Sequence, residues 1–387
     1  MKTFLLEYNP HKQAGMSHQA LTREILHSLP KAELHCHLDG SMRVETIIEL
    51  ARKQGVSLPS FDAAELRKVM VQDKVRSLVE YLKAFDITLS VLQDYESLKR
   101  AAYEMAEDAA KDNVVYLEVR FAPILHQQRG MRLTSVLDAV LDGLREAERD
   151  FGIRSGVIVC AMRMSDPKYS VLMAELCVMY KHRGVVGFDL AGAEAGNPAL
   201  DHREAFQLVL RNNVNITIHA GEAYGPESIS QALHFCGAHR LGHAVRLKED
   251  GDLLNYCADH RTPLEICLTS NRQTNATPDL RFHPLRMYYD YGLRVCLCTD
   301  NVLVSGTTLT DEFLLAHEVH NFSLEELKDI IVFTVKSSFL HHREKVDLLH
   351  DILRRLKSIQ LLPGTAPTGA AVADIPTETF TKSHATV

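Results

Sequence analysis

Histidines and carboxylates gather at the ends of several short apolar segments of the sequence. The first of these segments closes with His35-Cys36-His37-Leu38-Asp39. Because side chains alternate across a strand, those of His35, His37 and Asp39 would point to one side. Two imidazoles whose nitrogens meet at one point make a good site for a borderline-soft metal ion. Hydrogen bonds alone could also satisfy such a pair, so this motif by itself leaves the choice open.

Three further segments end in residues that could complete a metal site. One closes with His219-Ala220-Gly221-Glu222, another holds His243, and a third ends in Asp300-Asn301. A divalent ion held by His35, His37, His219 and Asp300 would have three nitrogen ligands and one carboxylate ligand. Zinc suits this donor set best, with a water in an open coordination position. We therefore expect one zinc ion per chain.

Glu222 and His243 are the candidates for proton transfer, with Asp300 as the third catalytic residue. Bound zinc lowers the pKa of its water from about 15.7 toward about 7. Glu222 follows His219 by three residues and is placed to exchange a proton with a substrate. His243 could orient the attacking water or deprotonate it. Glu265 is expected to orient a metal-bound or catalytic histidine through a hydrogen bond to its ring, and Ser270 is expected to act in the same way.

Eight apolar, β-branched runs would position these residues. They cover residues 32–39, 114–123, 155–163, 185–192, 215–222, 240–245, 263–270 and 294–301. Amphipathic stretches such as 133–151 and 203–211 lie between them, with apolar residues at helical spacing. Eight strands that alternate with helices over about 270 residues predict an α/β fold, the (β/α)₈ TIM barrel, whose sites lie at the carboxyl ends of the strands. Glu118 and Arg120 alternate in the second run, and we interpret them as a buried ion pair.

Three segments depart from a minimal barrel. Residues 1–28 form a preamble, and residues 29–362 form the barrel itself. The stretch at about 43–111 is too long for one crossover helix and predicts a helical lid inserted after the first strand. From residue 363 to 387 the sequence is rich in Gly, Pro, Ala and Thr, which is typical of a disordered tail.

Composition narrows the function classes. The formal charge of -7 argues against a nucleic-acid-binding surface. No stretch approaches the roughly 20 apolar residues of a membrane span, and the N-terminal apolar patch is too short for a signal peptide. The eight scattered cysteines indicate reduced thiols and a cytoplasmic protein.

The motifs together resemble the adenosine deaminase family of the amidohydrolase superfamily. The resemblance begins at Lys31-Ala32-Glu33-Leu34-His35-Cys36-His37-Leu38-Asp39-Gly40-Ser41 and includes His219-Ala220-Gly221-Glu222 and Arg240-Leu241-Gly242-His243. It also takes in residues 77–82, 116–123 and 188–192, and Thr299-Asp300, so that it runs from about residue 29 to 356 in the family's order.

The resemblance implies a reaction and a set of substrate contacts. Glu222 would donate a proton to purine N1, and His243 would steer hydroxide onto C6, so that ammonia leaves. Asp39 would meet the ribose hydroxyls, and the Gly192 backbone N–H would meet N3. The expected partners are a small purine nucleoside and water, with no nucleic acid and no membrane.

Two departures from the family's pattern bear on the substrate. Asn301 stands where many members have a second aspartate that donates a hydrogen bond to purine N7, and an amide can donate without a raised pKa. With Asp300-Asn301, the chain also resembles a bacterial branch of the family that has Asp-Asn at this point. Ala193-Glu194 follows Gly192 where an acidic pair is common, so the contacts beside N3 are open.

We expect zinc-dependent deamination of adenosine and 2′-deoxyadenosine to inosine and 2′-deoxyinosine. The alternatives are deamination of aminodeoxyfutalosine, of adenine or of a 6-aminopurine nucleotide. A nucleotide would need a cationic clamp, for which Arg43 and Lys53 are the nearby candidates. A binuclear amidohydrolase is disfavoured because the fourth run, residues 187–192, offers no bridging lysine. A barrel without enzymatic activity is disfavoured because the sequence retains all four expected metal ligands and the proposed proton donor, Glu222.

Overall fold

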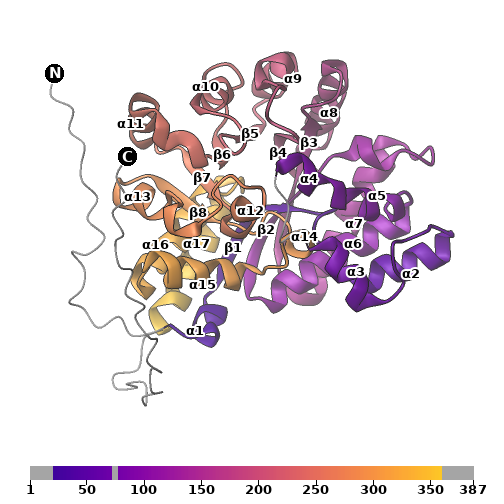
Figure 1. The fold of residues 1–387 in the computed structure, drawn as a ribbon, viewed down its shortest axis with the longest axis horizontal. Coiled ribbons are helices and arrows are strands. Elements are labelled where there is room, and N and C mark those ends of the chain that lie inside the picture. Colours follow the sequence, from indigo (N-terminus) through magenta and orange to yellow (C-terminus); the bar gives the residue numbers. More distant parts are fainter. Residues whose placement is uncertain (1–20, 72–76, 360–387) are drawn as a thin grey trace, which may run out of the picture. The chain divides into compact units, whose positions relative to one another are not determined.

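A barrel of eight parallel strands forms the core of the computed structural model, which describes residues 21–71 and 77–359 (Figure 1). The strands pair in sequence order from β1 to β8. An isolated parallel bridge between Cys36 and Asp300 brings β8 back to β1. The strands are β1 (Lys31–His37), β2 (Val114–Phe121), β3 (Arg154–Met162), β4 (Val185–Ala191), β5 (Asn215–Ala220), β6 (Arg240–His243), β7 (Pro263–Ile266) and β8 (Arg294–Leu297). The predicted (β/α)₈ barrel is confirmed.

Helices surround the strands, as Figure 1 shows. Between β2 and β7 they are α7 (Leu133–Phe151), α8 (Pro167–Tyr180), α9 (Arg203–Arg211), α10 (Pro226–His234) and α11 (Gly251–Asp259). After β7 come α12 (Leu268–Gln273), α13 (Leu285–Asp290), α14 (Val302–Ser305), α15 (Leu309–His320), α16 (Leu324–Ser337) and α17 (His342–Ser358). The amphipathic spacing located α7 and α9 correctly, because one face of each helix is buried against the strands.

The segment between β1 and β2 is helical, as predicted for the insertion. It contains α2 (Val44–Gln54), α3 (Ala63–Met70), α4 (Leu78–Tyr81), a 3₁₀ turn η1 (Leu82–Ala84), α5 (Phe85–Val91) and α6 (Tyr95–Lys111). The side chains of α4, η1 and α5 line a pocket together with residues at the strand ends. The insertion therefore contributes one wall of that pocket.

Some predicted boundaries fall differently. The run at 263–270 is not one strand, since β7 ends at Ile266 and α12 begins at Leu268, which places Ser270 on a helix. Within the preamble, Arg23–Ser28 form helix α1, and residues 1–20 lie outside the described residues, as does the predicted tail. All eight cysteines are buried and free. None of the helices among the described residues is long and apolar enough to cross a bilayer.

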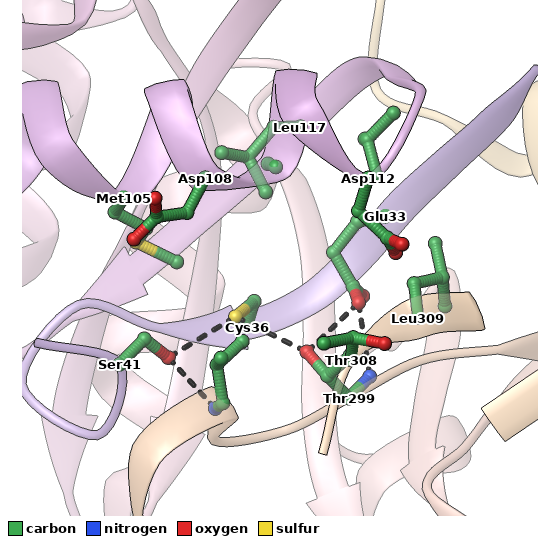
Figure 2. Close-up of a pocket in the computed structure, with 13 residues that line it drawn as sticks. Glu33, Cys36, Ser41, Met105, Asp108, Asp112, Leu117, Thr299, Thr308 and Leu309 are labelled. Atoms are coloured by element: carbon green, nitrogen blue, oxygen red, sulfur yellow. Dashed lines mark hydrogen bonds between the residues drawn. The ribbon is translucent and has the colours of Figure 1, made fainter. Parts of the chain in front are cut away.

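Polar contacts on the outer side of β1 tie this strand to the segment after β8. Glu33 accepts hydrogen bonds from the backbone N–H and the hydroxyl of Thr299, both at 2.9 Å. The Thr299 hydroxyl lies 3.2 Å from the Cys36 sulfur, which also contacts the Ser41 hydroxyl at 3.3 Å. Figure 2 shows these residues around a small cavity below α6. The contacts hold His35 and His37, on either side of Cys36, in register with Asp300.

The barrel interior holds a network of buried charges. Arg240 pairs with Glu118 and with Glu265, each at 2.6 Å. Arg120 pairs with Glu265 at 2.9 Å and with Asp189 at 3.0 Å. The predicted Glu118–Arg120 pair is therefore wrong, although both residues are buried. Each arginine instead bridges carboxylates on other strands, as the cost of burying charge requires.

Candidate active site

Four side chains meet at the carboxyl ends of β1, β5 and β8. They are the predicted ligands His35, His37, His219 and Asp300, and one donor atom from each lies within 4.8 Å of the other three. The Nε2 atoms of His37 and His219 are 3.1 Å apart. One Asp300 oxygen lies 3.3 Å from His37 Nε2 and 3.4 Å from His35 Nε2.

The donor set fits a zinc ion. His35 is fully buried, yet its Nε2 has no hydrogen-bond partner and faces the cluster. Burial and the neighbouring histidines keep the pKa values of His37 and His219 below the usual range, so both rings are neutral. Neutral imidazole nitrogens and an ionised carboxylate are the forms that bind metal. Three nitrogens and one oxygen leave room for a water.

Buried carboxylates hold His35 and His219 in orientation. Glu265 contacts His35 Nδ1 at 2.8 Å, and Asp189 contacts His219 Nδ1 at 3.1 Å. Burial would raise the pKa of Glu265, but the guanidiniums of Arg120 and Arg240 hold it well below its usual range. Ionised carboxylates at Nδ1 keep the ring protons there and direct each Nε2 lone pair into the cluster. No role for Asp189 was predicted from the sequence, although the residue lies within the family-like segment 188–192.

The hydroxyl of Ser270 donates to the second oxygen of Asp300 at 2.6 Å. Asp300 itself has a φ of +62°, in the left-handed region that non-glycine residues rarely adopt. His243, at the end of β6, has a φ of +63°. Strain of this kind persists at functional sites where surrounding contacts over-determine the backbone.

Glu222 lies beside the cluster and is 5% exposed. The hydroxyl of Thr274 donates to one of its oxygens at 2.8 Å, and His243 Nε2 lies 3.7 Å from the other. Burial, and then the negative charge of Asp300, raises the pKa of Glu222 to about 8. A carboxyl group with this pKa holds its proton at neutral pH and can donate it.

Glu194 holds the loop that carries Glu222. Its carboxylate accepts four consecutive backbone N–H groups, those of residues 221, 222, 223 and 224, at 2.6 to 3.0 Å. Consecutive N–H groups in a turn form a concave anion site, and here a buried side chain fills it. Sequence reasoning missed Glu194, because a glutamate in a loop gives no sign of which backbone it contacts.

We expect Glu194→Ala to lower the free energy of unfolding by at least about 2 kcal/mol, because it leaves four N–H groups without an acceptor. It should also lower kcat, since Glu222 loses its fixed loop. The matched control is Glu249→Ala, which removes only an exposed pair with Arg246 and should change stability by no more than about 1 kcal/mol. Urea unfolding and steady-state rates measure both variants. If Glu194→Ala and Glu249→Ala changed the free energy of unfolding and kcat equally, the role given to Glu194 would be ruled out.

A pocket opens over the cluster, with about 1350 Å³ of empty space when its mouth is included. The predicted substrate-binding residues Asp39, Gly192 and Asn301 all line it, together with Glu222 and His243. Asp39 is 5% exposed, and one of its oxygens has no partner. Burial raises its pKa to about 7. Gly192 has a φ of +98°, and a Cβ there would lie 2.6 Å from the Met164 sulfur.

Asn301 contacts the lid. Its amide nitrogen lies 3.0 Å from the hydroxyl of Tyr81 on α4, which in turn contacts the Ser305 hydroxyl at 2.7 Å. The amide oxygen is buried without a partner, and a Cβ on Gly40 would lie 1.8 Å from it. Gly40 is therefore needed to admit the Asn301 side chain.

The two predicted candidates for a phosphate clamp do not reach this pocket. Arg43 donates to Asp108 at 2.8 Å, and neither Arg43 nor Lys53 is among the lining residues. The lysine that lines the pocket is Lys83, on η1 of the lid.

The chain is similar in sequence to known proteins of one enzyme family. A family model described as adenosine deaminase matches residues 30–355. The adenosine deaminase of Mycobacterium sp. (strain JLS) is 42% identical over 352 residues, which cover 86% of this chain and 97% of that protein. A Dictyostelium discoideum protein named "Probable adenosine deaminase" is 41% identical over 344 residues. These cover 89% of this chain but only 45% of that longer protein.

A solved structure of similar fold is that of an adenine deaminase from Arthrobacter aurescens, with a TM-score of 0.80 at 28% identity. The match covers 85% of this chain and 99% of that chain. Arabidopsis N6-mAMP deaminase gives a TM-score of 0.77 at 32% identity, with 86% and 99% covered.

Proposed function

Since the chain belongs to the adenosine deaminase family, we propose that it hydrolyses the 6-amino group of adenosine and 2′-deoxyadenosine. The products are inosine or 2′-deoxyinosine and ammonia. The observation that carries the proposal is the buried Glu222, whose raised pKa keeps it protonated beside the cluster of histidines and Asp300. The chain is accordingly a metal-dependent aminohydrolase acting on a small purine.

We propose zinc as the metal, held by His35, His37, His219 and Asp300. When bound, zinc supplies a water that is activated at neutral pH. His243 orients that water toward C6 of the purine, and Glu222 donates a proton to N1 as the carbon–oxygen bond forms. The carbon–nitrogen bond at C6 then breaks. The amino group leaves as ammonia with one proton of the water, and the other proton of the water replaces the one that Glu222 gave to N1. A 6-oxopurine, ammonia and a re-protonated Glu222 then account for all atoms.

The remaining lining residues would fix the nucleoside. Asp39 has a free carboxylate oxygen for a ribose hydroxyl. The backbone N–H of Gly192 would donate to N3, and the Asn301 amide would donate to N7. Eight free cysteines support a cytoplasmic location, where thiols stay reduced.

A nucleotide substrate is the second candidate, because an N6-mAMP deaminase shares the fold and Lys83 lines the pocket. Ammonia or methylamine release should be compared for adenosine, 2′-deoxyadenosine, adenine, a 5′-arylated adenosine and N6-methyl-AMP. We expect the two nucleosides to react with the highest kcat/KM. A preference for N6-methyl-AMP that Lys83→Ala removes would favour the nucleotide instead, and a preference for adenine or the 5′-arylated compound would likewise contradict the proposal.

The protonation state of Glu222 predicts the pH dependence. Its pKa is raised to about 8, so the protonated, donating form predominates below that pH. Activity should therefore fall as pH rises past about 8, by about tenfold in kcat/KM per unit once the proton is lost. A kcat/KM profile for adenosine measures this limb. Activity that continues to rise above that pH would show that Glu222 is not the proton donor.

A further inference from the structure

A line of buried hydrogen bonds runs from the candidate active site to the outer layer of the barrel. The amide nitrogen of Asn271, on α12, lies 3.0 Å from His243 Nδ1. The amide oxygen of Asn271 lies 3.1 Å from His283 Nε2. The backbone N–H of Leu285, at the start of α13, donates to His283 Nδ1 at 3.1 Å. The three side chains are 0 to 4% exposed.

The direction of every bond in this line follows from its outer end. A backbone N–H can only donate, so His283 Nδ1 accepts, and the neutral His283 ring carries its proton on Nε2. That N–H donates to the Asn271 oxygen, which can only accept. The Asn271 nitrogen can only donate, and His243 Nδ1 must accept from it. A neutral imidazole that accepts at Nδ1 carries its proton on Nε2.

His283 is a fixed reference for this assignment. Burial, and then the neighbouring His320, holds the pKa of His283 well below its usual range, so the ring stays neutral. The ring centroids of His283 and His320 are 6.1 Å apart. The positive charge of Lys248 also disfavours a proton on His283. The line therefore keeps one direction throughout the neutral pH range.

The far nitrogen of His243 faces the reacting groups. His243 Nε2 lies 3.7 Å from a Glu222 oxygen, and the ring centroid is 4.9 Å from that of His35. The backbone there is held in place, since the Tyr288 hydroxyl donates to the carbonyl of Ala244 at 2.9 Å. Whatever Nε2 carries, a proton or a lone pair, it presents toward Glu222 and the histidine cluster.

We propose that Asn271 and His283 are positioning residues that fix His243 with its proton on Nε2. His243 then donates a hydrogen bond to the oxygen that adds to purine C6, and it does not take a proton from the attacking water. Of the two roles that the sequence leaves open for His243, orientation and deprotonation, this arrangement selects orientation. The inference rests on the proposed function for the identity of the attacked atom, but the tautomer itself does not depend on it.

The direct test is nitrogen NMR of the full-length, zinc-loaded protein with ¹⁵N-labelled histidine. Long-range ¹H–¹⁵N correlations distinguish a protonated ring nitrogen from an unprotonated one, and the His243 signals are those lost in His243→Gln. We expect a protonated Nε2 and an unprotonated Nδ1. A proton on Nδ1 in the wild-type protein would overturn the inference, whatever the activity.

Variants test the function of the line. Asn271→Asp keeps the size of the side chain but replaces the donor by a carboxylate, which accepts from Nδ1–H and reverses the tautomer. We expect kcat to fall roughly 10²- to 10⁴-fold while KM and zinc content change little. Asn255→Asp is the matched control, since it makes the same change at an exposed position on α11 that does not line the pocket. Unchanged kcat in Asn271→Asp would overturn the role of Asn271.

His283 gives a second, graded test. His283→Leu removes the donor to Asn271 and should lower kcat roughly 10- to 100-fold. His283→Gln retains an N–H donor and should recover most of that loss, which a merely space-filling role would not predict. Equal kcat in the Leu and Gln variants would overturn the role of His283. Protein with the expected His243 tautomer but without turnover of adenosine would refute the proposed function alone.

Discussion

We expect replacement of Glu222 by Gln to reduce deamination of adenosine by at least about 10³-fold, near the upper end of what loss of a general acid costs. The amide has the same shape as the carboxyl group and keeps the contact with Thr274, but it has no proton to transfer to purine N1. The zinc content of the variant should equal that of the wild type, because Glu222 is not among the four residues of the cluster. Steady-state rates and metal analysis of the same preparation measure both quantities.

Glu312→Gln is the matched control for Glu222→Gln. Glu312 is also fully buried, and burial raises its pKa to about 7. It accepts hydrogen bonds from Thr269 and Thr307 and does not line the pocket. We expect this variant to keep its kcat within a few-fold of the wild type. Substantial activity in Glu222→Gln would show that Glu222 is not the proton donor.

The second large effect concerns the metal. Asp300→Ala removes the only carboxylate of the cluster, and we expect the purified variant to lack zinc and activity. Ser270→Ala removes only the hydroxyl that donates to Asp300 at 2.6 Å, and it should weaken zinc binding roughly 10- to 100-fold. Chelator competition followed by zinc analysis gives both affinities. Asp300→Ala with a full complement of zinc would contradict the assigned ligand set.

The sequence was sufficient for the barrel, because a buried parallel strand leaves a continuous apolar run that turns and helices interrupt. The same pattern placed His35, His37, His219 and Asp300 at strand ends, where a parallel barrel brings them together. Strand ends were less certain. Ser270 was expected in a strand but lies on α12. Residue types alone did not show that the strand ends at Ile266 and that a helix follows it.

Contacts between segments that are distant in the chain could not be predicted from the sequence. Arg120 was expected to pair with Glu118 two residues away, but it bridges Asp189 and Glu265 on other strands. The carboxylate of Glu194 binds backbone N–H groups, which carry no sequence signal. The partners of Asn271 likewise depend on how α12 packs. These residues hold the reacting groups in place, and only three-dimensional packing identifies them.

Ammonia release from adenosine by the purified protein is the most direct test of the central claim, measured before and after removal of metal by a chelator and again after zinc is restored. The account predicts turnover that disappears with the metal and returns with one zinc per chain. Turnover that persists in demonstrably zinc-free protein, or no release of ammonia from zinc-loaded protein, would contradict it.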